Sequence, residues 1–211
     1  MQIVKQDGDM LLCVKPAGVA AQGEAGMEGL LRAQTGGAVF PVHRLDQAAA
    51  GLMLFAKTPA AAAALSRQVR EGTVDKEYLT LVSGMPDPPA GRMEDLLYHD
   101  ARRNKTFPVT SPRRGVRRAA LTYRTLATQN GVSLVRAALE TGRTHQIRVQ
   151  FASRGMPLLG DGKYGSRIKG ELALWSCALA FEHPKTGERL RVFLPPEGEV
   201  WRAWKEWGEQ G

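Results

Sequence analysis

The chain has few of the residues that build disulfide scaffolds and metal centres. Its 211 residues include two cysteines, Cys13 and Cys177, and four histidines. Each cysteine lies alone in an apolar stretch, which argues against a disulfide framework or a paired-cysteine zinc site and favours a reduced, cytoplasmic compartment. The histidines never take the spacing of a helical metal motif such as HExxH, so we expect no metal.

Long hydrophobic runs are also missing. The first ten residues contain no apolar stretch after a basic start, and no later segment reaches the roughly 18 uninterrupted apolar residues of a membrane helix. The sequence therefore predicts a soluble protein that is not exported and has no membrane partner. A chain of this length is expected to form one domain over residues 1–211, with room for two lobes.

Acidic residues are outnumbered by basic ones. Lys and Arg number 29 and Asp and Glu 21, which gives a net charge of +8, and the isoelectric point is about 9.8. This balance favours a nucleic-acid partner over an inert basic surface. The excess gathers in residues 101–118, where we expect a loop or edge ribbon that binds phosphates, with a solvated loop as the alternative. Its seven basic residues are Arg102, Arg103, Lys105, Arg113, Arg114, Arg117 and Arg118.

Strand patterns outnumber helix patterns along the chain. Buried strands are predicted before Pro16, after Gly51 and in 73–84, and short helices in 26–36 and 142–155. The clearest helix signature, in 58–72, has Thr58 as N-cap, a proline at the first helical position and a glycine after the last turn.

Two hairpins complete this prediction. Asn130-Gly131 joins two β-rich runs and is a strong signal for a two-residue hairpin turn, and a second hairpin is predicted around 184–187. The fold class that follows is α+β, with a mixed, mainly antiparallel β-sheet and flanking helices. Trp201, Trp204 and Trp207 recur at every third position near the C-terminus. We expect them to dock on the same chain, and the protein to be a monomer.

Asp46 lies between an extended run that ends at His43 and a second that begins at Gly51. We therefore expect it in a turn at the end of core strands, where rigid elements hold a carboxylate open to a cleft. Its neighbour Arg44 could project into the same groove and bind a phosphate. Local capping of its own turn is the alternative role for Asp46.

Polar residues cluster in 140–150, directly after the first hairpin. Such a cluster is costly to bury without partners. An ionised Asp46 needs a cation nearby, and Arg148 is the natural candidate, although a surface cation is the alternative. Tyr78 could stack on a base or serve only as a core aromatic. The remaining candidates for RNA contact in this cluster are Arg143, His145 and Gln146.

Four segments together resemble the RluA-like pseudouridine synthases. They are DGDMLLCVKPAGVAAQG, VHRLDQAAAGLMLFAKT, DKEYLTLVSG and LETGRTHQIRVQFASRGMPLLGDGKYG. The resemblance runs from about residue 7 to about residue 195. The motifs HRLD and TGRTHQIR together are specific for this family, whereas either motif alone would be weak evidence. It implies the pseudouridine synthase fold, with a central RNA-binding cleft between two halves of the sheet.

The resemblance also implies an activity and its residues. Asp46 matches the catalytic aspartate, Tyr78 the tyrosine that stacks on the target base, and Arg148 the arginine that pairs with the catalytic carboxylate; Arg44 matches the arginine beside the aspartate. The implied reaction isomerises a uridine of RNA: the N-glycosidic bond breaks, the uracil rotates, and it rejoins the ribose through carbon. Whether Asp46 attacks the sugar, attacks the base or removes a sugar proton stays open. No cofactor or metal is implied.

The implied substrate is tRNA or ribosomal RNA, as in short members that consist of the catalytic domain. Many relatives begin with an additional small RNA-binding domain, and we expect none here because the first matching segment starts by residue 7. The chain also has Ala48, Ala49 and Ala50 where relatives usually carry polar residues, including a Thr-Ser pair. Those hydroxyls would brace the turn around the aspartate.

Two other functions stay open at this point. The triple alanine and the basic surface suit a catalytically weak or inactive RNA-binding or RNA-folding protein on the same fold. A hydrolase using Asp46 and Asp161 as paired carboxylates is the third hypothesis, and release of free uracil would distinguish it.

Overall fold

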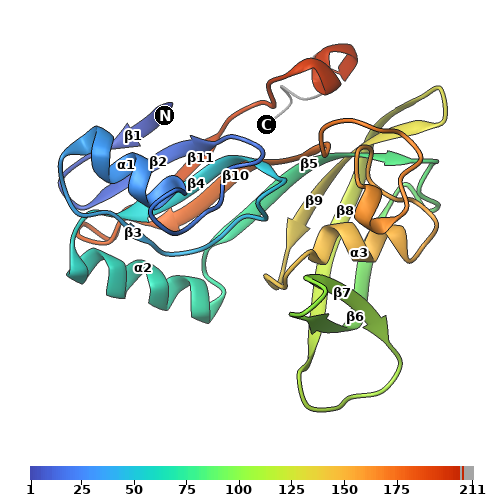
Figure 1. Cartoon of the computed structure of the whole chain (residues 1–211), viewed down its shortest axis with the longest axis horizontal. Coiled ribbons are helices and arrows are strands. Elements are labelled where there is room, and N and C mark those ends of the chain that lie inside the picture. Colours follow the sequence, from blue (N-terminus) through green and yellow to red (C-terminus); the bar gives the residue numbers. More distant parts are fainter. Residues whose placement is uncertain (205, 207–211) are drawn as a thin grey trace. The chain divides into compact units, whose positions relative to one another are not determined.

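The computed structural model describes residues 1–204 and 206 of the chain. The chain divides into two compact units (Figure 1). Unit 1 comprises Met1–Lys76 and Trp175–Pro195, and unit 2 comprises Glu77–Leu174 and the chain from Pro196 onward. Each unit is described by itself. The expectation that residues 1–211 form one domain stays a prediction.

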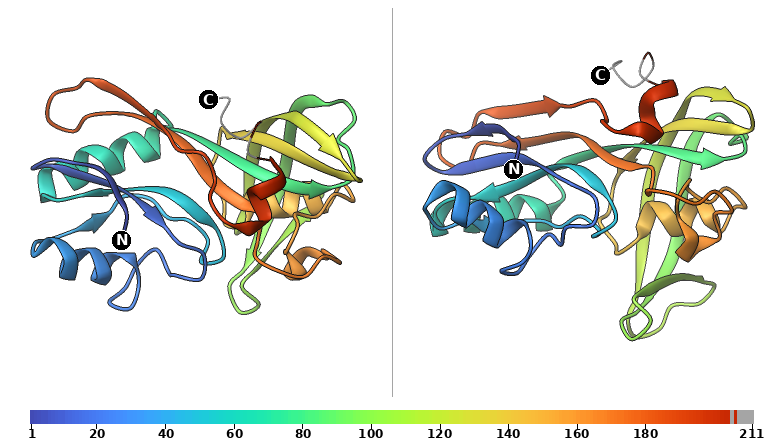
Figure 2. Two further views of the ribbon diagram at one scale, coloured as in Figure 1. Left: turned by 90° about the horizontal axis from the view of Figure 1, so that it is seen from above. Right: turned by 45° about the horizontal axis from the view of Figure 1, so that its top comes forward.

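Unit 1 is built on a mixed set of strands in the order β1-β2-β4-β10, with β3 beside β4 and β11 beside β10. The pair β4–β10 is parallel and the other pairs are antiparallel. Figures 1 and 2 show the β10–β11 hairpin lying with the N-terminal strands although it is far away in sequence. The bounds are β1 Ile3–Gln6, β2 Met10–Lys15, β3 Phe40–Pro41, β4 Ala50–Ala56, β10 Leu174–Glu182 and β11 Arg189–Phe193.

Strand β4 is buried at every position, which explains its uninterrupted apolar sequence. Because side chains alternate between the faces of a strand, Leu52 and Leu54 share one face. There they join a core cluster with Ala61 and Leu65 of helix α2. The helices of this unit are α1, Met27–Thr35, and α2, Pro59–Glu71.

The boundaries of α2 are those predicted from the sequence. The Thr58 side chain accepts a hydrogen bond from the Ala61 N–H at 3.1 Å, which satisfies one of the free donors of the first turn. Gly72 ends the helix with φ +75°, a left-handed conformation that favours glycine.

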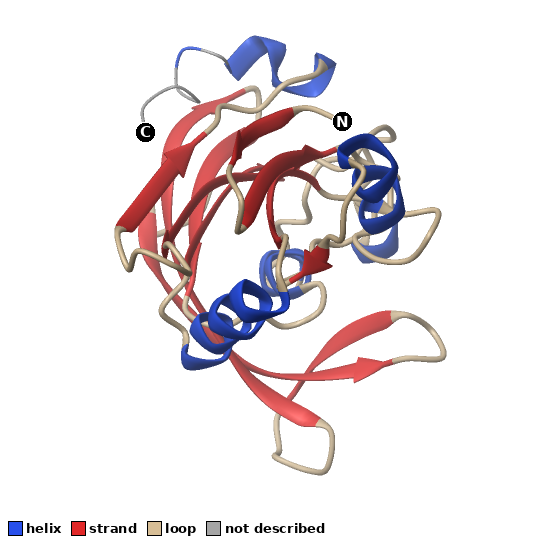
Figure 3. Cartoon of the chain, turned by 90° about the vertical axis from the view of Figure 1, so that its left-hand side faces the viewer, coloured by secondary structure: helices blue, strands red, loops and turns tan. Residues whose placement is uncertain are grey.

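Unit 2 is built on antiparallel strands in the order β5-β9-β8-β6-β7. The strand bounds are β5 Asp75–Ser83, β6 Ala90–Asp100, β7 Lys105–Val109, β8 Val116–Gln129 and β9 Val132–Leu139. The helical elements are α3, Gln146–Ala152, and the 3-10 segments η1, Gly162–Tyr164, and η2, Glu199–Trp204. Residues 96–118 project from the unit, and we call them the arm (Figures 1 and 3). They comprise the end of β6, all of β7 and the start of β8, and β6 pairs with both other strands.

The mixed, mainly antiparallel α+β fold is confirmed, and so are both predicted hairpins. Asn130 and Gly131 take φ of +52° and +73°, the conformation that a two-residue turn of this kind requires. Residues 101–118 were predicted as a loop or an edge ribbon, and the edge ribbon is what they form: β7 is an edge strand and β8 begins at Val116. The extended run before Asp46 forms only the two-residue strand β3.

Two further sequence expectations concern the C-terminus and membranes. Trp201 and Trp204 are buried in η2, and Trp207 lies outside the described residues. Within the described part of the chain, no helix is long and apolar enough to cross a membrane.

Candidate active site

Asp46 lies at a turn that its neighbours anchor to the core of unit 1. The turn is closed by a hydrogen bond from the Ala49 N–H to the Asp46 carbonyl at 3.1 Å. Leu45 and Ala49 are 5 % and 1 % exposed, whereas Asp46 itself is half-buried and Arg44 is exposed. The chain therefore fixes the backbone of Asp46 while leaving its side chain near the surface.

Strand β4, which follows the turn, begins where its backbone lies very close to that of β10. Gly51 pairs with Ser176 of β10 and has φ +112°. A Cβ at this position would lie 2.4 Å from the Ser176 carbonyl oxygen. The close approach of β4 and β10 therefore requires glycine here, five residues after the aspartate.

A fully buried lysine braces the turn from behind. Lys15 has no exposed surface, and its ammonium donates hydrogen bonds to the carbonyls of Pro16, Val19 and Gln47 at 2.8, 2.8 and 3.0 Å. Gln47 also pairs with Gly18, whose N–H donates to the Gln47 carbonyl at 2.8 Å and whose carbonyl accepts from Gln47 Nε2 at 2.9 Å. The loop after β2 and the Asp46 turn are thus joined through one cation.

Lys15 also sets the charge around the aspartate. Burial lowers the pKa of Lys15 to about 8, against the opposing effect of the negative charge of Asp46. At pH 7 the side chain is therefore an ammonium within electrostatic reach of Asp46. The sequence analysis missed this residue, although a lysine ending the apolar strand MLLCVK before Pro16 was a signal that could have found it.

The alanines after Asp46 take no part in this bracing by side chain. The carbonyl of Gln47 and the ammonium of Lys15 hold the turn, and Ala49 and Ala50, which are 1 % and 9 % exposed, pack into the core. The hydrogen bonds that hydroxyl groups were expected to give the turn are supplied here by the Lys15 ammonium and by backbone groups.

His43, three residues before Asp46, supports β4. Its Nε2 accepts a hydrogen bond from the Leu54 N–H at 3.0 Å. Burial, followed by the positive charge of Lys76, lowers the pKa of His43 to about 4. The ring is therefore neutral at pH 7, as an acceptor at Nε2 must be.

In unit 2, Tyr78 lies on the face of the sheet that α3 covers. Tyr78 of β5 pairs with Ala137 of β9, which pairs in turn with Tyr123 of β8. Directly opposed residues of antiparallel strands project from the same face. The Tyr123 ring contacts the Phe151 ring of α3 edge to face, with centroids 5.8 Å apart, so Tyr78 and the helix share one face of this unit.

Arg148 of α3 forms a buried, bidentate ion pair with Asp161. Nε and Nη2 of Arg148 donate to the two carboxylate oxygens at 2.6 and 2.8 Å, and the two side chains are 7 % and 1 % exposed. A pair of this geometry fixes the plane of the guanidinium. Both oxygens of Asp161 are engaged by a cation, which does not suit the general acid that the hydrolase hypothesis needs.

The polar residues before Arg148 fold the chain into the helix. The Gln146 carbonyl oxygen accepts from the Thr141 hydroxyl at 2.8 Å and from the Arg143 N–H at 3.0 Å, and its amide nitrogen donates to the Ala120 carbonyl at 3.0 Å. Gln146 therefore fastens the 141–143 turn to β8. Its predicted contact with RNA stays a prediction, now beside a clear structural role.

His145 is the N-cap of α3 and has φ +56°, an uncommon conformation outside glycine. Its Nδ1 lies 2.9 Å from the Tyr164 hydroxyl. The side chain is buried, at 7 % exposure. Arg143 is exposed and donates from Nε to the Arg118 carbonyl at 2.9 Å.

Of the seven predicted phosphate-binding residues of the arm, Arg118 differs from the other six. Arg118 forms a bidentate pair with Glu94, at 2.7 and 2.8 Å, and these contacts raise the pKa of Arg118 and lower that of Glu94 to about 2. The Glu94 carboxylate offsets much of the positive charge of Arg118. Arg118 is therefore a weaker candidate for binding phosphate than its sequence suggested.

The other six residues lie towards the turns of the arm. Arg113 stacks over the Tyr98 ring at 5.1 Å, and Lys105 lies 5.3 Å from the centroid of Tyr164. The remaining members, all exposed, are Arg102, Arg103, Arg114 and Arg117.

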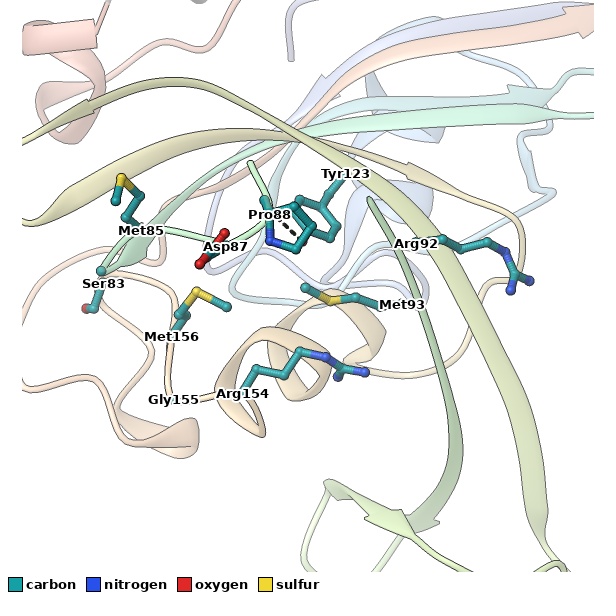
Figure 4. A pocket seen from close by; sticks show the side chains of 11 residues that line it. Ser83, Met85, Asp87, Pro88, Arg92, Met93, Tyr123, Arg154, Gly155 and Met156 are labelled. Atoms are coloured by element: carbon teal, nitrogen blue, oxygen red, sulfur yellow. Dashed lines mark hydrogen bonds between the residues drawn. The ribbon is translucent and has the colours of Figure 1, made fainter. Parts of the chain in front are cut away.

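A pocket of about 640 Å³ also opens in unit 2 (Figure 4). Its lining includes Met85, Met93, Met156 and Tyr123, whose hydroxyl donates to the Pro88 carbonyl at 2.9 Å. None of the residues predicted for the site lines it. Among the described residues, no group of three or more His, Cys, Asp or Glu side chains could hold a metal ion.

Comparison with known proteins identifies the class of this chain. The family described as RNA pseudouridylate synthase matches residues 9–153, more than half of the chain. The chain belongs to this family of isomerases that act on RNA, as the motifs around Asp46 and Arg148 predicted.

Individual relatives narrow the class to RluA-like enzymes. The chain is 35 % identical to an uncharacterized RNA pseudouridine synthase of Mycobacterium bovis, over 97 % of this chain and 72 % of the relative. It is 34 % identical to ribosomal large subunit pseudouridine synthase C of Pasteurella multocida, over 94 % and 65 %. Among solved structures it is similar to human RNA pseudouridylate synthase domain containing 1, with a TM-score of 0.80, 25 % identity and coverage of 92 % and 83 %.

The brace around Asp46 gives a first prediction. Replacing Lys15 by methionine keeps the length of the side chain but leaves three buried carbonyls without their donor. Because each unsatisfied buried acceptor costs about 1–3 kcal/mol, we expect Lys15→Met to lower the free energy of unfolding by about 3 kcal/mol or more in urea titrations. The matched control is Lys5→Met at an exposed position, which should change it by less than about 0.5 kcal/mol. Equal stability of the two variants would contradict the bracing role.

Proposed function

We propose that the chain isomerises specific uridines of tRNA or ribosomal RNA in the cytoplasm, acting as a monomer with Asp46, Tyr78 and Arg148 as its catalytic residues. The family establishes the reaction, and the relatives named as ribosomal large subunit pseudouridine synthases C and D point to structured cellular RNA as the substrate. The single observation that carries the residue assignment is the Asp46 turn, which a buried ammonium holds in place inside the HRLD motif.

The proposed sequence of events begins with the arm. Exposed arginines at its turns attract the phosphate backbone. A uridine inside folded RNA must leave its stack before side chains can reach it, at a cost of a few kcal/mol. Tyr78, rigid on β5, replaces the lost stacking with its ring.

The chemical step rearranges the uridine without adding or removing atoms. The N-glycosidic bond breaks, the uracil rotates, and a carbon–carbon bond to the ribose replaces it; that carbon loses its hydrogen as a proton, and the freed ring nitrogen takes up a proton. Asp46 acts as nucleophile or base in this step. We propose that Arg148, whose Nε and Nη2 donate to Asp161, keeps Asp46 ionised.

The inactive RNA-binding alternative depended on a turn weakened by the alanines. In unit 1 the turn is braced by Lys15 and by the Gln47–Gly18 pair, so the alanines no longer argue for a lost activity.

The second prediction concerns Asp46. We expect Asp46→Asn to lower the rate of pseudouridine formation at least 10³-fold, because the amide is neither a nucleophile nor a base, while RNA affinity changes less than threefold. Pseudouridine in total tRNA and in ribosomal RNA, incubated separately with the protein, is measured by nucleoside chromatography. Asp75→Asn, at an exposed surface ion pair, is the control and should retain the wild-type rate. Wild-type activity in Asp46→Asn, or release of free uracil by the wild type, would refute the assignment.

The third prediction separates Arg118 from the other predicted phosphate-binding residues of the arm. Each phosphate contact contributes about 0.9 to the slope of log K against log salt for a duplex and about 0.7 for a single strand. We expect Arg114→Ala to reduce this slope by roughly that amount and Arg118→Ala to reduce it by less, because Glu94 offsets the charge of Arg118. Binding is measured by fluorescence anisotropy at several salt concentrations. A larger effect for Arg118→Ala would show that the ion pair opens to bind RNA.

A further inference from the structure

Tyr164 is half-buried and has no part in the proposed chemistry, yet it contacts three functional elements of unit 2. Its hydroxyl accepts a hydrogen bond from the Thr106 N–H of β7 at 2.8 Å. The same hydroxyl lies 2.9 Å from Nδ1 of His145, the N-cap of α3. Its ring centroid lies 5.1 Å from Cζ of Arg148.

The two hydroxyl contacts are compatible with each other. A tyrosine hydroxyl can accept one hydrogen bond and donate another. Since it accepts from Thr106, its own hydrogen can be donated to Nδ1 of His145 when Nε2 carries the ring proton. The Thr106 hydroxyl adds a second tie, because it donates to the Thr144 carbonyl at 2.8 Å. The edge strand of the arm is therefore fastened directly to the start of α3.

The segment that carries Tyr164 also carries the partner of Arg148. Asp161 engages one edge of the guanidinium, and three residues later the Tyr164 ring lies under Cζ of the same guanidinium. Between them, Lys163 donates to the Asn104 carbonyl in the turn of the arm at 2.9 Å. Residues 161–164 thus contact the arm at its turn and its edge strand, and contact Arg148 through both Asp161 and Tyr164.

Gly160 anchors this segment at its start. It has φ +76°, and a Cβ there would lie 2.0 Å from the Glu171 carbonyl oxygen. The close backbone approach leaves the segment little freedom at that end. A displacement of the arm would therefore act on residues 161–164 and on the guanidinium they hold.

We propose that Tyr164 is a positioning residue for Arg148, which couples RNA contact along the arm to the orientation of the guanidinium. This inference rests on the proposed function, in which the arm binds phosphates and Arg148 acts beside Asp46. Lys105, next to Thr106 on β7 and 5.3 Å from the Tyr164 ring centroid, connects the phosphate-binding side chains with the same strand.

The ring and the hydroxyl of Tyr164 have separate roles. The ring packs against Leu97, Ala119 and Val149, which supports the fold. The hydroxyl joins β7 to His145, which supports the coupling. Tyr164→Phe keeps the first role and removes the second, so it separates positioning from simple packing.

The test measures single-turnover pseudouridine formation at saturating RNA and, separately, the Kd for RNA. We expect Tyr164→Phe to lower the rate about fivefold to tenfold, the size of a lost hydrogen bond of this kind, with the Kd changed less than twofold. Tyr123→Phe is the matched control, because it also removes one tyrosine hydrogen bond in unit 2, to the Pro88 carbonyl (Figure 4). It should leave both quantities unchanged.

Coupling to the arm is tested by combining variants. The double variant Arg102→Ala and Arg103→Ala changes the turn of the arm, away from the Tyr164 hydroxyl. At saturating RNA, the double variant should lower the rate of pseudouridine formation about threefold or more when Tyr164 is present. In the Tyr164→Phe protein it should lower the rate less than 1.5-fold further, because the connection between the arm and α3 is already broken.

Three results would overturn the inference. They are an unchanged rate in Tyr164→Phe, a rise in Kd that accounts for the whole loss of activity, and independent, multiplicative effects of the arm and Tyr164 variants. A wild-type protein that forms no pseudouridine would instead refute the proposed function on which the inference depends, so the two failures are distinguishable.

Discussion

Burying a cation is costly unless polar groups replace the water it loses, and this constraint shapes each of the two units. Lys15 is buried in unit 1, and Arg148 is buried in unit 2. Three backbone carbonyls satisfy the first, and the Asp161 carboxylate satisfies the second. Because each charge must keep these partners, each also fixes the chain segment that supplies them.

In each unit the buried cation fixes a segment that carries a candidate site residue. The carbonyls that accept from Lys15 belong to the loop after β2 and to the turn that carries Asp46. The hydrogen bonds that Lys15 needs therefore also hold the backbone of Asp46 in place. The carboxylate that satisfies Arg148 belongs to the segment that also carries Tyr164. That segment also contacts the edge strand and the turn of the arm, which directly connects the arm to the side chain proposed to act with Asp46.

Much of this architecture could be predicted from local sequence signals. The caps of α2 and the Asn130-Gly131 turn depend on conformations that a few residue types adopt, and both are where the sequence places them. The class of enzyme also followed from the sequence, since HRLD and TGRTHQIR together are specific. The polar turn at Asp46 and the helix carrying Arg148 are likewise where the pattern predicted them.

The parts that could not be predicted depend on pairing between distant segments. A lysine at the end of an apolar strand marks Lys15 as unusual, but its role in bracing the Asp46 turn depends on its contact with Gln47, 32 residues later. The partner of Arg148 is Asp161, 13 residues away, which the sequence offered only as a carboxylate of the hydrolase hypothesis.

We propose above that this chain makes pseudouridine in structured RNA through Asp46. The most direct test maps pseudouridine at single-nucleotide resolution in the tRNA and ribosomal RNA of cells that lack the gene and of cells complemented with the wild type or with Asp46→Asn. The account predicts at least one position that is modified only with the wild-type copy. An identical modification pattern in all three strains would contradict it.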